Sequence, residues 1–261
     1  MLTAGFRHRL LGGILSLTLA APLTLRAQEH TALELLLRCG TLESFDSIQH
    51  LPATDRTPAR LVLGDANGYV RVYEQRHDAW DEAWRSRHME GGIVSIVIAD
   101  VFEDGLDETV VFTDQGRIYY LDSAVYNTLW SNTPGEYSRI TAGTVATFRD
   151  DPKPKLVFVA DGRLTIIDSQ DRFVEWRSDQ TTLSTTQILI ADVDGDGQDD
   201  IVLNDGYVFG SRFGALKWHY ASGFGERMMV MDLEGDGILN LVCEYRGRFV
   251  RIYDVNLRRE K

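Results

Sequence analysis

The sequence has few of the features that usually reveal an enzyme. It contains only two cysteines, Cys39 and Cys243, and no Cys-x-x-Cys pair. It has no Gly-x-Ser-x-Gly elbow and no glycine-rich phosphate loop, and its histidines lack the spacing of metal ligands. These absences remove the common nucleophilic, phosphate-binding and zinc sites, so we expect a non-catalytic protein. Whether the two distant thiols pair in an oxidising compartment stays open at this point.

Basic residues are also scarce. The chain has 27 Lys and Arg against 39 Asp and Glu, which gives a net charge of −12. Removal of residues 1–27 would take away three arginines and no acid, so the charge would become −15. An acidic surface of this size argues against nucleic acid and against anionic membranes as partners.

Long apolar runs are absent except at the start of the chain. Arg7, His8 and Arg9 precede an apolar run over 10–25, and Ala27 stands where a signal peptidase could cut. This layout is typical of a secretory signal peptide, and the run is too short and too rich in small residues for a membrane span. The sequence therefore predicts a signal peptide over 1–27, a secreted or periplasmic location, and no span in the mature chain.

What the chain does contain is a repeat. Four similar phrases end in tryptophan at intervals of 46, 46 and 42 residues, at Trp84, Trp130, Trp176 and Trp218. Glycines that indicate hairpin turns keep the same period, at Gly68, Gly116, Gly162, Gly206 and Gly247. Each unit divides into four short strands, which is the pattern of a β-propeller blade.

The repeat predicts one all-β domain over residues 28–261, a propeller of five four-stranded blades that acts as a monomer. The units are about 40–86, 87–132, 133–178, 179–220 and 221–261. The fifth unit is expected to lack its fourth strand, and residues 32–39 resemble an unattached strand of that kind. We expect residues 32–39 to complete the last blade and close the ring, since this would hide an open sheet edge. The repeated tryptophans are expected to pack between neighbouring blades.

The most specific motif lies in the fourth unit, at residues 192–200. Aspartates stand at positions 1, 3, 5 and 9 of a short loop, and Gly197 stands at position 6. Carboxylates this close repel one another, and oxygen ligands at alternate positions suit a hard ion of the Ca²⁺ type. The alternative is a solvated acidic turn without an ion. The expected ligands are the side chains of Asp192, Asp194, Asp196 and Asp200 and the backbone carbonyl of Gln198.

An EF-hand loop would begin in the same way, but it requires Glu at position 12 and a helix on each side. Here position 12 is Leu203, and the flanks 186–191 and 201–203 are short, apolar and β-branched. They are typical of strands, so the loop joins two strands of a sheet.

These units resemble the FG-GAP/VCBS repeat, the blade of integrin α-subunit propellers and of many secreted bacterial proteins. The resemblance lies in the Asp192–Asp200 motif of the fourth unit and in Phe224-Gly225 and the 232–240 motif of the fifth. It implies that such loops bind Ca²⁺ between the first and second strands of a blade. A second ion would then be held by Asp232, Glu234, Asp236, the carbonyl of Ile238 and Asn240.

The other units depart from this pattern. The second has Asp100, Asp104 and Glu108 at positions 1, 5 and 9, but Phe102 stands at position 3. We expect that loop to be free of metal. The first and third units contain no ligand set.

These features favour an exported interaction module, an adhesion or scaffold protein that binds an unknown protein or glycan. The partner is expected on the face opposite the acidic loops, where His88, Met89, Tyr137 and Phe224 are candidate contacts. Two alternatives remain open. One is a carbohydrate-binding lectin, and the other is a glycan-cleaving enzyme that takes one carboxylate from each of several blades.

Overall fold

The computed structural model describes residues 47–55, 57–77, 79–212 and 214–261. The signal peptide expected over 1–27, the strand expected over 32–39 and Cys39 lie outside the described residues. None of the described residues forms a helix long and apolar enough to cross a bilayer.

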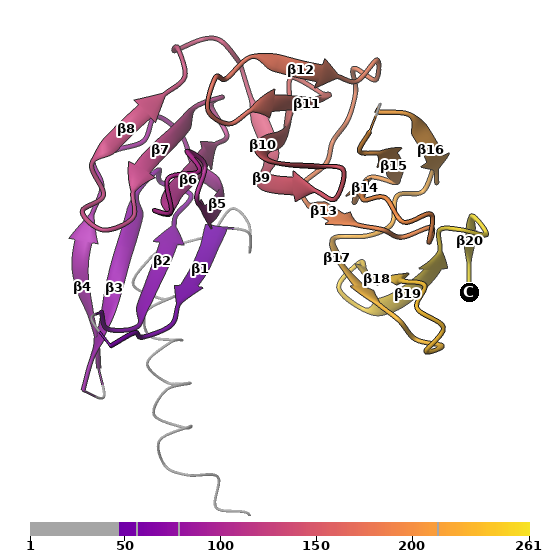
Figure 1. Cartoon of the computed structure of the whole chain (residues 1–261), viewed down its shortest axis with the longest axis horizontal. Coiled ribbons are helices and arrows are strands. Elements are labelled where there is room, and N and C mark those ends of the chain that lie inside the picture. The colour runs from indigo at the N-terminus through magenta and orange to yellow at the C-terminus, as the bar shows by residue number, and fades with distance from the viewer. Residues whose placement is uncertain (1–46, 56, 78, 213) are drawn as a thin grey trace, which may run out of the picture.

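The described chain forms five antiparallel sheets of four strands each (Figure 1). The first blade contains β1 (Ile48–Leu51), β2 (Arg60–Gly64), β3 (Val70–Arg76) and β4 (Ala79–Arg85). The second contains β5 (Ile93–Ala99), β6 (Glu108–Thr113), β7 (Ile118–Asp122) and β8 (Thr128–Ser131). The third contains β9 (Ile140–Phe148), β10 (Asp151–Ala160), β11 (Arg163–Asp168) and β12 (Val174–Arg177). The fourth contains β13 (Ile188–Ala191), β14 (Asp200–Leu203), β15 (Tyr207–Gly210) and β16 (Leu216–His219). The fifth contains β17 (Arg227–Met231), β18 (Asn240–Tyr245), β19 (Phe249–Asp254) and β20 (Arg259–Glu260).

Each strand pairs with the next one in sequence, so every sheet is a simple meander. Contacts between blades run through the first strands, from β1 to β5, β5 to β9, β9 to β13 and β13 to β17. These strands therefore lie innermost, and the sheets radiate from them (Figure 1). The prediction of an all-β propeller with five four-stranded blades is confirmed.

The turn between the second and third strands explains the periodic glycines. In the third blade Asp161 and Gly162 have φ angles of 49° and 74°, and a tight hairpin turn of this type needs positive φ at both central residues. At Gly116 a Cβ would lie 2.1 Å from the backbone oxygen of Tyr137, so only glycine fits beneath the neighbouring loop.

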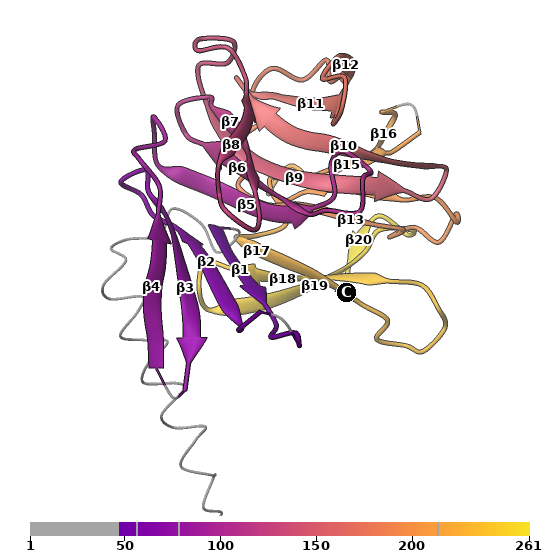
Figure 2. The same ribbon diagram turned by 60° about the vertical axis from the view of Figure 1, so that its left-hand side comes forward.

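The third blade has a longer first hairpin than its neighbours. Phe148 pairs with Asp151, so only two residues separate β9 from β10. Figure 2 shows these two strands lengthwise. Where the second, fourth and fifth blades carry an acidic loop, this blade therefore has a tight turn.

The hydrophobic core lies between the blades. Four clusters of buried side chains join successive blades, and the repeated tryptophans pack against them. Trp84 contacts Tyr126 of the next blade at a ring-centroid distance of 4.9 Å, and Trp176 contacts Phe209 at 5.8 Å. The prediction that the tryptophans pack between blades is confirmed.

The last blade differs from the prediction. The chain turns at residues 255–258 and returns as β20, which pairs Glu260 with Tyr253 and Arg259 with Asp254. The expectation that the fifth unit lacks a fourth strand is therefore wrong. β20 covers only the end of the β19 edge, at Tyr253 and Asp254, and the pairing expected of residues 32–39 stays a prediction because they lie outside the described residues.

The described sheets form an arc with its open side between the first and last blades (Figure 1). Among the described residues, no hydrophobic cluster joins the fifth blade to the first. The fifth sheet exposes large apolar side chains instead, with exposed fractions of 51% for Met229 and 71% for Val250. Cys243 points away from solvent into the core shared with the fourth blade, and burial raises the pKa of its thiol to about 12.

A core substitution tests the packing between blades. Phe158 is fully buried between the second and third blades and contacts the rings of Phe112 and Tyr137. We expect Phe158→Ala to lower the free energy of unfolding by about 3–5 kcal/mol, because it leaves a cavity. Phe173 is 54% exposed, and Phe173→Ala should cost less than about 1 kcal/mol. Urea unfolding measures both, and equal losses would contradict the assigned core.

Candidate metal centre

The acidic loop joins β13 to β14 and is shaped by its own side chains. The two carboxylate oxygens of Asp192 accept the amide N–H groups of Gly195 at 2.9 Å and Gly197 at 3.0 Å. Asp196 accepts the amide N–H of Gln198 at 2.8 Å. Gly197 has a φ of 85°, so the turn at position 6 requires the left-handed conformation that glycine adopts without strain.

Asp200, the first residue of β14, lies at the base of the loop. Its side chain is fully buried, and its Oδ2 accepts the amide N–H of Val193 at 3.1 Å. Its Oδ1 is also buried and lies 2.7 Å from the ammonium of Lys217. Burial raises the pKa of this carboxyl to about 6, with a further contribution from the charge of Asp194, while Lys217 acts in the opposite direction. This carboxylate therefore needs a nearby cation.

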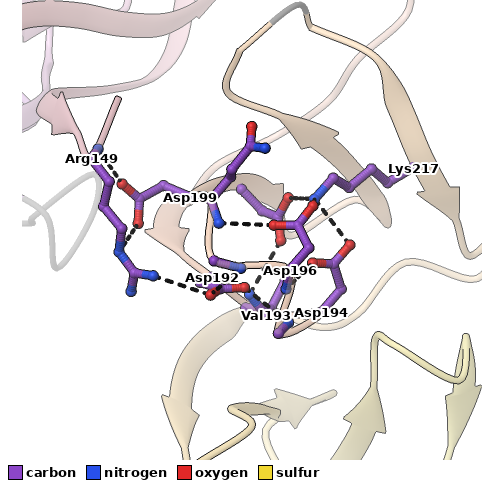
Figure 3. A network of polar contacts seen from close by, with 11 residues as sticks. Arg149, Asp192, Val193, Asp194, Asp196, Asp199 and Lys217 are labelled. Carbon is purple, nitrogen blue, oxygen red and sulfur yellow. Dashed lines mark hydrogen bonds and ion pairs between the residues drawn. The ribbon is translucent and has the colours of Figure 1, made fainter. Parts of the chain in front are cut away.

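An ammonium from β16 lies inside the loop (Figure 3). The Nζ of Lys217 is 2.9 Å from Asp194 Oδ2, 2.7 Å from Asp196 Oδ2 and 2.7 Å from Asp200 Oδ1. Burial alone would lower the pKa of Lys217, but its contacts with the three carboxylates outweigh burial and raise it. One positive charge thus faces three negative ones.

The remaining carboxylate of the loop is tied to the neighbouring blade. Arg149, in the tight turn between β9 and β10, places its Nη1 3.1 Å from Asp192 and its Nε 3.3 Å from Asp199 (Figure 3). The amide N–H of Arg149 also donates to Asp199 at 2.8 Å. Neither Arg149 nor Asp199 belongs to the predicted ligand set. Arg149 is 43 and 50 residues from its two partners, so no local pattern could have revealed the contact.

The residues of this loop fit a divalent cation. Asp192, Asp194 and Asp200 each bring one oxygen within 4.8 Å of the others, and Asp196 is next to them. Ca²⁺ takes six to eight oxygens at about 2.3–2.6 Å and favours such carboxylates. Three carboxylates face the ammonium of Lys217, and Asp192 and Asp199 share the guanidinium of Arg149, so five carboxylates against two cations leave an excess of negative charge. The predicted aspartates are therefore brought together as a potential ligand set.

The fifth blade repeats the same turn in a more open form. Asp232 accepts the amides of Gly235 at 2.6 Å and Gly237 at 2.9 Å, and Asp236 accepts that of Ile238 at 2.9 Å. Asn240 is buried at the base, as Asp200 is in the fourth blade.

The cation of this fifth loop is the C-terminal lysine. Lys261 Nζ lies 2.6 Å from Glu234 Oε1, and with the amide of Asn240 suitably oriented it donates to Oδ1 at 3.1 Å. Asp232, Glu234 and Asp236 are exposed, so this ligand set is less enclosed than the one in the fourth blade.

The second blade keeps the turn without the ligands. Asp100 accepts the amides of Asp104 at 3.1 Å and Gly105 at 2.8 Å, and Glu108 accepts that of Val101 at 3.1 Å. Phe102, at position 3, packs against the ring of Tyr120. The loop therefore keeps the hydrogen bonds of the turn although position 3 offers no ligand, and the absence of metal from it stays a prediction.

The third blade contains a charged cluster that sequence reasoning missed. The side chain of Lys155 is 3% exposed, and its Nζ lies 2.5 Å from Glu175, 3.2 Å from Asp151 and 3.6 Å from Asp168. A signal existed in the repeat alignment. In the third blade Glu175 precedes Trp176, and in the fourth Lys217 precedes Trp218 at the same place in the repeat. Likewise Lys155 of the third blade aligns with Asp200 of the fourth. The signs of the two charges are exchanged between the blades.

The opposite end of the propeller contains a cavity of about 480 Å³ between the second, third and fourth blades. Asp114, Arg139, Asp161 and Ser184 are among the residues that line it. The aromatic and apolar contacts expected on this face are mostly inaccessible. Met89, Tyr137 and Phe224 are buried beneath the loops, so the expectation that they meet a ligand is wrong, whereas His88 is exposed.

No family model and no curated protein matches the chain. Solved structures do resemble it. A chain from the crystal structure of BBS1N in complex with ARL6DN has a TM-score of 0.60 and 14% identity, covering 85% of this chain and 69% of that one. The Neurospora crassa Pan2 WD40 domain has a TM-score of 0.53 and 12% identity, covering 83% and 64%. The Vibrio cholerae biofilm matrix protein Bap1 has a TM-score of 0.54 and 19% identity, covering 80% and 37%. At these identities the comparisons show the β-propeller fold and no family.

Substitution of Lys155 tests the cluster in the third blade. Lys155→Met leaves three carboxylates without their cation, so we expect the free energy of unfolding at pH 7 to fall by about 2–4 kcal/mol. Lys153 is exposed on the same strand, and Lys153→Met should change it by less than about 0.5 kcal/mol. Denaturant unfolding of the two variants provides the comparison.

The loss caused by Lys155→Met should depend on pH. Burial alone would raise the pKa of Asp168, but the amides of Asp171 and Gln170 and the ammonium of Lys155 outweigh burial and lower it. A carboxyl with a lowered pKa stabilises the fold above its ordinary value of 3.8, and this contribution is lost as the pH falls below that value. The difference between wild type and variant should therefore shrink below about pH 4. A difference independent of pH would contradict the ionic role of Lys155.

Proposed function

We propose that this chain is an exported, non-catalytic β-propeller of the FG-GAP/VCBS type that binds Ca²⁺ and serves as a protein-interaction scaffold. The observation that carries the calcium proposal is the convergence of Asp192, Asp194 and Asp200, whose ligand oxygens lie within 4.8 Å of one another. The fully buried Asp200 carboxylate, whose Oδ1 lies 2.7 Å from the ammonium of Lys217, supports it, because a buried carboxylate at this position requires a cation. A second and weaker ion would occupy the fifth loop, held by Asp232, Glu234, Asp236, Asn240 and the carbonyl of Ile238.

The ion would have a structural role. It would neutralise carboxylates that otherwise repel one another and would clip β13 to β14 at the end of the fourth blade. The same carboxylates would be occupied as ligands, so they would not be available for acid–base chemistry.

Interaction with a protein partner is supported by the fold and by the opposite end of the propeller. Among the similar structures, BBS1N was crystallised in complex with ARL6DN, and Bap1 is a biofilm matrix protein. The cavity of about 480 Å³ offers a concave surface lined by the cation of Arg139 and the carboxylates of Asp114 and Asp161. A glycan partner has less support, because Tyr137 and Phe224 are buried and cannot stack on a sugar.

Calcium binding is tested by thermal unfolding. With free Ca²⁺ at a hundred times its Kd, the free energy of unfolding should rise by about 2.7 kcal/mol relative to EDTA. For a domain of this size the Tm should then rise by about 5–10 °C. Asp200→Asn keeps the shape and the hydrogen-bond acceptor but removes the charge, so its response to Ca²⁺ should be lost. Identical melting curves of the wild type in Ca²⁺ and in EDTA would refute the calcium proposal.

The partner surface is tested by affinity capture from the source medium. Arg139→Glu reverses a charge that lines the cavity, and we expect it to reduce retention of the captured partner at least tenfold. Lys153→Glu makes the same change at an exposed site near the other end of the propeller and should retain the partner. Mass spectrometry quantifies the captured proteins, and equal capture by both variants would rule out the cavity as the contact surface.

A further inference from the structure

We propose that Lys217 is a built-in counter-cation that occupies the ion position of the fourth loop until Ca²⁺ displaces it. This inference rests on the proposed calcium binding of that loop and identifies the residue that limits its affinity.

The geometry makes the two cations mutually exclusive. Lys217 Nζ lies 2.7–2.9 Å from one oxygen each of Asp194, Asp196 and Asp200. Calcium contacts its oxygen ligands at about 2.3–2.6 Å, so an ion held by the same carboxylates would require almost the same place. A divalent ion and an ammonium at that separation would also repel each other strongly. Calcium can therefore bind these carboxylates only when Lys217 leaves them.

The position of Lys217 is determined by the fold. Its side chain is 21% exposed and reaches from β16 across β15 to the first residue of β14. The path runs over Gly210, where a Cβ would lie 3.1 Å from Cε of Lys217. The adjacent Trp218 packs into the core between the fourth and fifth blades and anchors the strand. A glycine on one side and an anchored strand on the other direct this lysine into the loop.

In two other blades a lysine ammonium also neutralises neighbouring carboxylates. In the third blade Lys155 compensates Glu175 and Asp151 beside a tight turn that has no calcium ligands. In the fifth blade Lys261 Nζ contacts Glu234 at 2.6 Å. A lysine ammonium thus occupies the base of three blades. In the third it has no predicted ligand set to compete for, whereas in the fourth it contacts three of the predicted calcium ligands.

Two consequences follow for the fourth loop. Without calcium, Lys217 keeps the carboxylates partly neutralised, so the blade stays folded. With calcium, the ion must compete with a tethered cation, which weakens its apparent affinity. Removal of the lysine charge should therefore tighten calcium binding and, at the same time, destabilise the calcium-free protein.

The test compares calcium affinity by isothermal titration of the full mature chain with CaCl₂. Lys217→Met retains most of the side-chain length without the charge and should lower the Kd for Ca²⁺ at least tenfold. Lys217→Arg retains the charge and should not tighten binding. Lys153→Met serves as the control for the loss of a lysine elsewhere. In EDTA, Lys217→Met should melt below the wild type, and saturating Ca²⁺ should reduce or reverse that difference.

The outcomes separate this inference from the calcium proposal. If the wild type binds Ca²⁺ and Lys217→Met binds it equally or less well, the inference is overturned and the calcium proposal stands. If neither binds, both are overturned. If only Lys217→Met binds Ca²⁺, the result supports the occupancy of the ion position by Lys217. It overturns both the displacement of Lys217 by Ca²⁺ and calcium binding by the natural chain. If Lys217→Met does not fold in EDTA, Lys217→Gln serves for the same comparison.

Discussion

The structure depends on the requirement that each four-stranded sheet buries its apolar faces against a neighbouring sheet. No blade of this size has enough core of its own, and the four clusters of fully buried side chains each draw on two successive blades. The tryptophan at the end of each of the first four repeats belongs to this contact. The same requirement explains the exposed apolar side chains of the fifth sheet, such as Met229 and Val250, since no described blade packs against that face.

A second constraint is the polar residue of the second strand that lies at the loop end of each blade; it is the first residue of that strand in four blades and the fifth residue of β10 in the third. The five residues at this position are Arg60, Glu108, Lys155, Asp200 and Asn240. A charge at such a place must be paired or hydrogen-bonded. Each blade does this differently. Arg60 donates to the carbonyl of Ser123 and the hydroxyl of Tyr126, Glu108 accepts a backbone amide, and Lys155 and Asp200 form ionic clusters of opposite sign. The proposed calcium ion would be one more solution to this shared requirement.

These two constraints divide the molecule into ends with different properties. At the end that carries the acidic loops, side chains hold loops to strands and, through Arg149, one blade to the next. At the other end, tight glycine turns and loops whose apolar residues point inward surround a cavity. The ionic contacts and the cavity therefore lie at opposite ends of the blades.

The sequence by itself determined the features that depend on local periodicity. The strand alternation, the hairpin glycines and the spacing of the tryptophans specified five four-stranded blades, and the spacing from Asp192 to Asp200 specified the loop that gathers carboxylates. Only the tertiary structure decided which cations face those carboxylates, because Lys217 reaches the loop from β16 and Arg149 from the turn between β9 and β10. It also decided that Tyr137 and Phe224 are buried, since a loop residue is covered only when neighbouring blades pack above it. Strand β20 was missed because two residues carry no period, and its pairing follows from the position of β19 alone.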